Sequence, residues 1–488
     1  MDLALLSFRR PLSSLSCLLW AFCVALTTAS SVGCGGTGTN PGGNTAVTVL
    51  STSTANDKFF QFSATMNTLT LTSQSGKTVS LLNTPVSPEF IHVNGTAEPL
   101  VTVNIPQGTY TSATASLGLA DFTCATVSPT TGTIATDQFS YDPVPADDVS
   151  VSLPDPITVI GKSMVLSLNL LVSLSASYTS CYTTGIEPFT LTPNFSITPS
   201  AISTQPTSSR DGKLNGLEGV VASINSAESS LIVNSVDNSN NWQVAFNGSS
   251  VYQGITGPSQ LAAGMVVDMD ASIQEDGSLL ATRIAVYDTD ATDVSLWSVP
   301  MIRMNTFGPQ VNVGDREGIG PLLLGDGAPV DFSKSAFNIS GQLTNLATLP
   351  FPAEFTGANM VAGQNIELTF HAPNNYSPSD YGFPAATITL LPQTINGTVG
   401  AVSTSGGFTT YTVTLAAYDL FPSLAVQVDQ ATLLTNPGSV VVYADSNTQL
   451  LNTSPIAVGS VVRFYGLVFN DNGTLRMDCA QINDGVAE

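Results

Sequence analysis

Three aspartates in one short polar stretch come nearest to a metal-binding pattern. Asp288, Asp290 and Asp293 alternate with small residues, and hard oxygen ligands of this kind suit Ca²⁺. The stretch departs from a calcium-binding EF-hand loop, because it has no Gly at the sixth position and no Glu at the twelfth. We therefore interpret it as a solvated acidic linker and expect no metal, with a weak calcium site as the alternative.

Histidine chemistry has little support in the sequence. His92 and His371 fall in different predicted domains, and neither accompanies a Ser or Cys motif that would form a nucleophile–base pair. The sequence contains no Gly-x-Ser-x-Gly, P-loop or dinucleotide-binding motif. We predict no catalytic residue, no cofactor and no enzymatic activity. A hydrolase built on paired carboxylates stays open, because distance along the sequence does not limit distance in space.

Other polar and aromatic residues have structural and binding interpretations. Asp268, Asp270, Glu275 and Asp276 are expected to point outward beside a hairpin. Aromatic side chains exposed on a β-surface would stack on sugars or bases. Packing in a core is the more frequent fate of such residues. The candidates are Trp242, Tyr252, Trp297, Tyr376, Tyr381 and Tyr411.

Composition limits the partners. Charged residues make up 10% of the 488 residues, against roughly 25% in ordinary soluble proteins. With 13 Lys and Arg against 36 Asp and Glu, the net charge is −23. This charge repels phosphate backbones, so we predict no nucleic-acid partner. Abundant Thr and Val, frequent Gly and Pro, and no long helical period predict an all-β protein.

The N-terminus has the pattern of an export signal. Arg9 and Arg10 precede an apolar segment from Cys17 to Leu26, which is short for a membrane span. The following Ser31-Val32-Gly33-Cys34 resembles a bacterial lipobox, which implies a signal peptide over residues 1–33 and a lipid on Cys34. Residues 34–45 would form a flexible tether. The alternative is plain secretion, with cleavage near Ala29.

Three cysteines remain beyond the signal and the lipobox. Cys124 and Cys181 fall in one predicted domain. An exported protein meets an oxidising compartment, so we predict a Cys124–Cys181 disulfide. Cys479 is expected to be a small buried residue rather than a reactive thiol.

Residues 46–200 show the alternation of a β-sandwich. At Ile105-Pro106 a strand ends, and another begins before Tyr110. A Pro, a Gly and an aromatic in this order predict a strand that leaves one sheet and enters the other. The stretch from Ile105 to Tyr110 also resembles an extracytoplasmic bacterial family, domain of unknown function 4382, with an Ig-like sandwich. Residues 201–213 are rich in Pro, Ser and Thr and are predicted to be a linker.

The rest of the chain repeats one pattern three times. We predict modules at 214–290, 296–391 and 394–488, the second of them degenerate. Each contains a Gly three residues after an apolar residue and just before an alternating strand, at Gly264, Gly363 and Gly459. These glycines should form tight turns with positive φ. Asp276-Gly277 and Asn472-Gly473 predict type I′ hairpins.

The shared pattern is Gly-x-Val-x-x-Val, then apolar-x-x-Gly-x-x-Val, then Asp/Asn-Gly-x-Leu. It resembles bacterial cell-envelope repeats of the type called domain of unknown function 5666, which implies an OB-like barrel. We therefore expect an N-terminal β-sandwich followed by three tandem small OB-like β-barrels. The family has no established activity, so the resemblance implies location and architecture only. As function we expect a lipid-anchored, non-enzymatic binding or scaffold protein of the bacterial envelope, with the membrane and an envelope protein or a glycan as partners. A surface glycan-binding or adhesion protein is the alternative.

Overall fold

The structure is a computed structural model that describes residues 43–484 with internal gaps. The gaps are 56–58, 95, 128–133, 142–146, 178–189, 201–212, 236–239, 275–276, 289–293, 306–307, 313–314, 318–326, 340–345, 372–382, 418, 420, 422–433 and 451–454. The described residues belong to one unit, Pro41–Glu488. Among them, no helix combines the length and apolar character needed to cross a membrane. The predicted signal peptide, Cys34 and most of the tether lie outside this part of the chain.

Two sheets share one core in the N-terminal domain, which confirms the predicted β-sandwich. The first sheet has the order β11-β8-β1-β4 and the second β3-β2-β5-β6, with β7 also paired to β5. Both contribute to one buried apolar cluster, with Val49 from β1 and Phe62 from β2 among its members. The strands are β1 (Asn44–Thr54), β2 (Phe59–Ser73), β3 (Thr78–Ser80), β4 (Glu98–Pro106), β5 (Gly108–Val127), β6 (Ile134–Tyr141), β7 (Asp147–Val159), β8 (Ser163–Leu171) and β11 (Phe195–Ser200). The short α1 (Val172–Ser175) and the pair β9 (Ala176–Ser177) and β10 (Thr190–Leu191) follow β8.

The chain changes sheets where the sequence predicts it. β4 ends at Pro106 in the first sheet, and β5 begins at Gly108 in the second. The Tyr110 hydroxyl donates to the Pro106 carbonyl at 2.8 Å, and its ring is buried. Pro106 has no N–H to offer to a ladder, so the strand ends there and the tyrosine fixes the corner.

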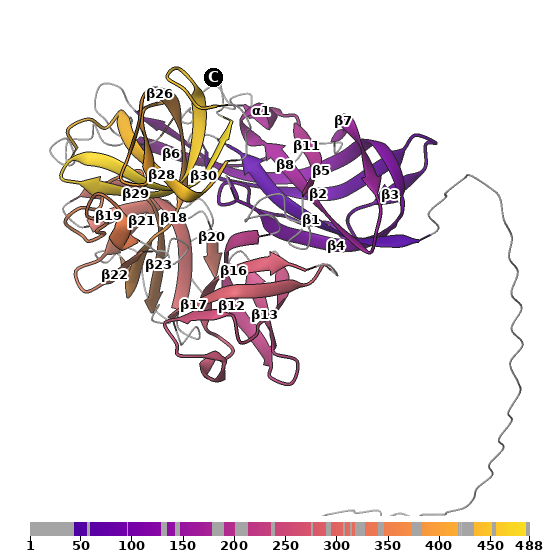
Figure 1. Ribbon diagram of the computed structural model, residues 1–488, viewed down its shortest axis with the longest axis horizontal. Coiled ribbons are helices and arrows are strands. Elements are labelled where there is room, and N and C mark those ends of the chain that lie inside the picture. Colours follow the sequence, from indigo (N-terminus) through magenta and orange to yellow (C-terminus); the bar gives the residue numbers. More distant parts are fainter. Residues whose placement is uncertain are drawn as a thin grey trace, which may run out of the picture. The chain divides into compact units, whose positions relative to one another are not determined.

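The first module is a closed five-stranded barrel. Its ladder runs β14-β13-β12-β16-β17, an additional β14–β17 pairing joins the two ends, and β15 pairs with β17 further along that strand. The elements are β12 (Lys213–Asn225), β13 (Ser230–Ser235), β14 (Asn241–Ala245), β15 (Val251–Gln253), the 3₁₀ turn η1 (Pro258–Gln260), β16 (Val266–Ile273) and β17 (Leu279–Asp288). Figure 1 shows β12, β16 and β17 as neighbouring strands of this barrel.

The second module is the most irregular of the three. Its strands run β22-β25-β23-β18-β19-β21-β24, and β20 also pairs with β18. They are β18 (Val294–Asn305), β19 (Gly308–Asn312), β20 (Asp315–Glu317), β21 (Gly327–Asp331), β22 (Ala336–Ile339), β23 (Asn365–His371), β24 (Phe383–Pro384) and β25 (Thr387–Leu390), with the 3₁₀ turn η2 (Leu346–Thr348). Its core contains Met360, Ile366 and Ile388.

The third module is a closed barrel of five strands in the order β26-β27-β28-β30-β29. The strands are β26 (Gln393–Ser405), β27 (Phe408–Leu415), β28 (Ser439–Leu450), β29 (Val461–Asp471) and β30 (Thr474–Asp484). Asn472 and Gly473 both have positive φ, +49° and +90°. The predicted type I′ hairpin is therefore confirmed between β29 and β30, since both central residues need that conformation.

The turn glycines have nearly the same conformation in all three modules. The φ angles are +89° at Gly264, +95° at Gly363 and +91° at Gly459. In the two closed barrels the hydrogen bonds also match. The N–H of Gly264 donates to the Val221 carbonyl and that of Gly459 to the Val399 carbonyl, both at 2.7 Å. The predicted turn is confirmed, and it repeats as a structural unit.

Candidate functional site

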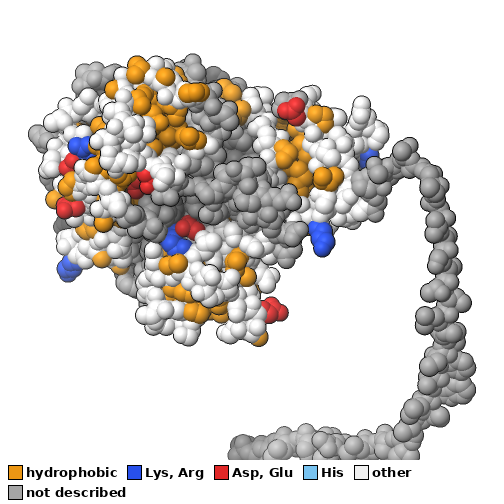
Figure 2. All heavy atoms as spheres, in the orientation of Figure 1, with side chains coloured by type: hydrophobic (Ala, Val, Ile, Leu, Met, Phe, Trp, Pro, Cys, Tyr) orange, Lys and Arg blue, Asp and Glu red, His pale blue; other side chains and the backbone are white. Residues whose placement is uncertain are grey.

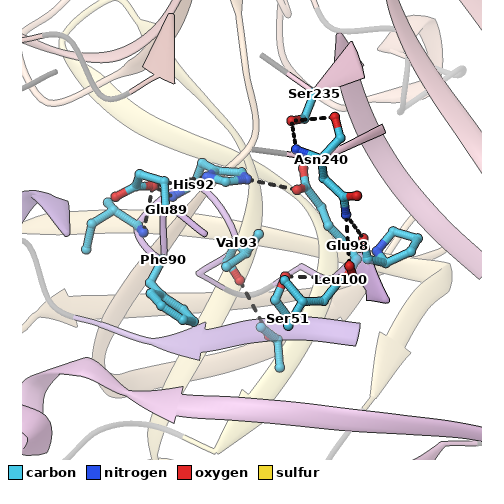
Figure 3. Close-up of polar contacts among 12 residues, drawn as sticks. Ser51, Glu89, Phe90, His92, Val93, Glu98, Leu100, Ser235 and Asn240 are labelled. Atoms are coloured by element: carbon cyan, nitrogen blue, oxygen red, sulfur yellow. Dashed lines mark hydrogen bonds and ion pairs between the residues drawn. The ribbon is translucent and has the colours of Figure 1, made fainter. Parts of the chain in front are cut away.

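A histidine held between two carboxylates lies at the edge of the sandwich. His92 Nδ1 is 3.0 Å from Glu89 Oε2, and His92 Nε2 is 3.1 Å from Glu98 Oε2. Glu98 opens β4, whereas Glu89 and His92 belong to the turn that precedes it. Figure 3 shows the imidazole between the two acidic side chains. The sequence interpretation missed this cluster, although Glu89-x-x-His92 is a visible three-residue spacing.

Glu89 is the fixed partner of this cluster. Its side chain is 1% exposed, and its oxygens accept the backbone N–H groups of Phe62, Ile91 and His92 at 2.7, 2.8 and 2.8 Å. A buried carboxylate with this many donors has its lone pairs satisfied, which offsets the cost of burying its charge. Glu89 therefore holds the turn against β2 and presents one oxygen to the imidazole.

The geometry determines what His92 can do. A carboxylate only accepts hydrogen bonds, so each ring nitrogen must carry a proton to bond to its neighbour. An imidazolium bonded on both sides has no lone pair for a metal ion or for a substrate proton. In this arrangement His92 is a charged link between Glu89 and Glu98, not a general base.

The same turn contacts the third barrel. We call residues 89–98 the bridging loop. The Asn94 carbonyl accepts the Thr394 hydroxyl of β26 at 2.7 Å, and Asn94 Oδ1 lies 3.5 Å from Nη1 of Arg463 on β29. Thr96 shares a side-chain hydrogen bond with Tyr465 of β29. Two strands of the third barrel therefore bind the bridging loop.

The start of β4 contacts the first barrel. The Pro99 carbonyl accepts Nδ2 of Asn240 at 2.6 Å and Nε1 of Trp242 at 2.9 Å. Asn240 Nδ2 also lies 3.1 Å from the Leu100 carbonyl, and Figure 3 shows it beside this strand. One short stretch of the sandwich thus carries contacts to both closed barrels.

A buried ion pair within the first barrel corrects the sequence interpretation. Asp268 and Asp270 were expected to point outward, but Asp268 is 0% exposed and the Asp270 side chain 16%. Nη2 of Arg283 lies 2.9 Å from Asp268 Oδ2, and its Nε lies 2.8 Å from Asp270 Oδ2. Burial alone would lower the pKa of Arg283, but the two carboxylates together raise it above its usual value.

The prediction failed because both faces of β16 are covered. Its apolar residues, such as Val267 and Met269, face the barrel core, and Asp268 between them is equally buried. Alternation of polar and apolar residues indicates an exposed face only where that face meets water. Two aspartates spaced by two share one face of a strand, and Arg283 is the cross-strand partner of Asp270. The other two acidic candidates, Glu275 and Asp276, lie outside the described residues.

The residues at the equivalent position of the other two repeats are also polar and buried. The fourth residue after the turn glycine is Asp268 in the first module, Glu367 in the second and Arg463 in the third. All three are buried, with exposures of 0%, 1% and 6%. In each module the polar position on the outer face of this strand is therefore withdrawn from solvent.

Glu367 is the most unusual of these side chains. Neither of its carboxyl oxygens has a hydrogen-bond partner among the described residues, and the same holds for the hydroxyl of Thr389, its cross-strand neighbour. Burial raises the pKa of Glu367 well above its usual value, and the negative charge of Asp268 adds to the rise. Burial without a hydrogen-bond partner therefore favours the neutral form of Glu367.

Tyr465 joins the same region from the third module. Burial, followed by the negative charges of Glu218 and Asp268, raises the pKa of Tyr465 above its usual value. We call Asp268, Glu367 and Tyr465 the polar junction. The negative charge of Asp268 acts on both Glu367 and Tyr465, and Tyr465 also bonds to Thr96 of the bridging loop.

A second carboxyl pair lies in the third barrel. Burial, together with the negative charge of Asp445, raises the pKa of Asp478 to about 6. Asp445 caps a turn, accepting the backbone N–H of Thr448 at 3.2 Å. Asp478 is thus an acid that titrates near neutral pH.

The remaining predicted site residues are distributed as follows. Trp242 and Tyr411 are core residues, at 4% and 8% exposure, and Tyr252 is half-buried.

Cys479 is a buried thiol whose Sγ lies 3.3 Å from the Gln481 carbonyl, which confirms its expected burial. Cys124 is buried in β5, but Cys181 falls in a gap, so their disulfide stays a prediction. Tyr376, Tyr381, Asp290 and Asp293 also fall in gaps, and the side chains of Trp297, Asp288 and His371 are not described.

Metal binding has no site in the part of the chain that the structure describes. No three His, Cys, Asp or Glu side chains there lie close enough to share an ion. Asp268 of the polar junction is instead paired with Arg283.

Comparison with known proteins supports the assignment of the first module. The family model described as domain of unknown function DUF5666 matches residues 218–285, and no curated protein matches the chain. Among solved structures, the chain is similar to "drosophila Unr CSD456", with 12% identity, 56% of this chain and 98% of that chain covered, and a TM-score of 0.13. A similarity with so low a TM-score does not establish the fold. The two closed barrels are identified from their strand pairing instead. The first barrel is therefore similar to the DUF5666 domains that the repeat pattern resembles.

Proposed function

We propose that this protein is an exported, lipid-anchored component of the bacterial cell envelope that acts as a binding or scaffold module without chemistry of its own. The carrying observation is that the bridging loop and the start of β4 directly after it bind both closed barrels, the loop through Asn94 and the strand through Pro99. Such contacts link the modules directly, in addition to the chain that connects them, as a scaffold requires.

The ionisable side chains support a structural role. His92 is used between Glu89 and Glu98, and Arg283 between Asp268 and Asp270. Groups that are held in ion pairs inside the fold are poor candidates for proton transfer or nucleophilic attack. On the face that Figure 2 shows, charged side chains of the described residues are few and scattered among polar and apolar ones. Such a surface favours contacts with neutral partners.

The glycan-binding alternative has less support. It depends on aromatic rings that are free to stack on sugars. Trp242 and Tyr411 contribute their rings to barrel cores instead, and Nε1 of Trp242 is already bonded to Pro99. We therefore expect the partner to be an envelope protein.

Cell fractionation with mass spectrometry tests the anchor. The mature protein should sediment with membranes and begin at a lipid-modified Cys34, and Cys34→Ala should release it. Cys23→Ala is the matched control, because that cysteine lies in the predicted signal and its loss should leave the membrane fraction unchanged. An unmodified N-terminus near Ser30 would refute the anchor. Crosslinking in intact envelopes should then capture a protein partner with wild type and not with the released variant.

A further inference from the structure

Two titratable groups of opposite type lie in the bridging loop and in the polar junction. His92 in the bridging loop is bonded to Glu89 and Glu98. Glu367 in the polar junction is buried without a hydrogen-bond partner for either oxygen among the described residues. The first contact requires a proton on both ring nitrogens, and the second group is accommodated only without charge.

We propose that the bridging loop and the polar junction form a pH-sensitive closure, which holds the modules together while His92 and Glu367 carry protons and loosens when either proton is lost. The proposal goes beyond the scaffold function, since it gives the scaffold two states. It depends on the geometry of the two sites and not on the identity of any partner.

Loss of the His92 proton weakens the bridging loop. A neutral imidazole has one donor and one acceptor, so it can bond to Glu89 or to Glu98 but not to both. The other nitrogen would then place its lone pair against a carboxylate oxygen about 3 Å away. Glu89 is held by three backbone N–H groups, so Glu98 is the partner that is released. Glu98 is followed directly by Pro99, whose carbonyl binds Asn240 and Trp242.

Loss of the Glu367 proton weakens the polar junction. The new charge would lie in a buried site that faces the negative charge of Asp268, and Glu218 and Asp270 add to the negative charge around Tyr465. Arg283 is the cation of this group, and it is already bonded to Asp268 and Asp270. Like charges in a site of low dielectric repel strongly, so separation of the second module from the first relieves the cost.

Both groups act in the same direction. His92 gains a carboxylate on each side in the folded state, so its contribution is complete at low pH and is lost as pH rises. The folded state favours the neutral form of Glu367, because burial raises its pKa. Folding is therefore also favoured at low pH and opposed as pH rises. The closure should therefore be tight in mildly acidic solution and looser in alkaline solution.

Hydrogen exchange of the full chain at pH 5.5 and pH 8.5, corrected for the intrinsic exchange rate at each pH, tests the closure. Protection of residues 91–98, β16, β23 and β29 should fall about tenfold or more at the higher pH, the loss expected for one charge-assisted hydrogen bond. β2 and β5 of the sandwich core serve as internal reference and should keep their protection. Equal protection of the closure at both pH values would overturn the proposal.

Two variants separate the two groups. Glu367→Gln keeps the shape of the neutral acid and cannot ionise, so it should remain folded. Between pH 5.5 and pH 8.5 the logarithm of its protection should fall by no more than half as much as that of the wild type. His92→Gln should have low protection of residues 91–98 at both pH values. His371→Gln, at the only other histidine of the sequence, is the matched control and should behave as wild type. If Glu367→Gln and His92→Gln both retained the full wild-type response, the proposal would be wrong.

Discussion

Arg283 on β17 and Asp268 on β16 form an ion pair inside the first barrel, with 2.9 Å between Nη2 and Oδ2 and side-chain exposures of 5% and 0%. Asp270 bonds the same guanidinium through Nε at 2.8 Å. One cation thus compensates two carboxylates, and its removal would leave both charges uncompensated. The pair makes this barrel dependent on a single side chain.

Arg283→Met should destabilise the protein by about 3–5 kcal/mol, the usual cost of leaving a buried partner charge unpaired. Urea unfolding at pH 7 measures the change. Lys334→Met is the matched control: Lys334 is exposed, so its loss should change stability by about 0.5 kcal/mol or less. Adding Asp268→Asn and Asp270→Asn to Arg283→Met should recover part of the loss, and no recovery would contradict the explanation.

Asp478→Asn should stabilise the third barrel in a pH-dependent way. Burial and Asp445 raise the pKa of Asp478 to about 6, above the roughly 3.9 of an unfolded aspartate. The folded state therefore binds the proton more tightly, and stability falls as pH rises from about 4 to 6. The variant removes this penalty, so it should gain about 1–3 kcal/mol at pH 8 and almost nothing at pH 4.

Urea unfolding at both pH values measures the effect of Asp478→Asn. Asp471→Asn is the control on the same hairpin, because it removes the partner that lies 2.6 Å from Nε of Arg476. That variant should lose stability at pH 8 instead of gaining it. A gain of equal size at pH 4 and pH 8 would show that Asp478 is not the titrating group.

The His92 ring should carry protons on both nitrogens in neutral solution. Nitrogen-15 NMR of the imidazole distinguishes a protonated nitrogen from a bare one, and with two histidines in the chain the His371→Gln variant leaves His92 alone. Glu98→Gln removes one carboxylate and should shift the loss of the proton to lower pH. A bare nitrogen on His92 at pH 6 would contradict the two-carboxylate geometry.

The turn glycines should differ in their tolerance of alanine. Gly459 has φ of +91° with nothing within 4 Å of an added Cβ, so Gly459→Ala should cost about 1 kcal/mol for the backbone alone. At Gly363, φ is +95° and an added Cβ would lie 2.9 Å from the Phe421 ring. Gly363→Ala should therefore cost about 1–3 kcal/mol more. Thermal unfolding compares them, and equal losses would refute the crowding argument.

The Cys124–Cys181 disulfide predicts a thiol count. With Cys34 carrying lipid, the denatured mature protein should react with a thiol reagent at Cys479 alone, and reduction should expose two more thiols. The bridge would close a loop of roughly 57 residues, worth about 4 kcal/mol in the chain-entropy model. Cys181→Ser should therefore lower stability and expose Cys124, and three reactive thiols before reduction would exclude the bridge.

Local sequence determined much of the architecture. Alternation and turn residues predicted the sandwich, the change of sheets between Pro106 and Tyr110, and the glycine turns at Gly264, Gly363 and Gly459. These features depend on φ preference, on the missing N–H of proline and on the two-residue period of a strand, all of which act within a few residues.

Tertiary structure alone decided the polar sites. The alternation in β16 identified which residues share a face with Asp268, but not that this face is buried or that Arg283 pairs there with Asp268 and Asp270. In the same way, Glu89-x-x-His92 was visible, whereas the second carboxylate and the barrels that bind the loop come from other elements. Burial and electrostatic partners depend on how modules pack, because a side chain loses its water only when a distant segment covers it.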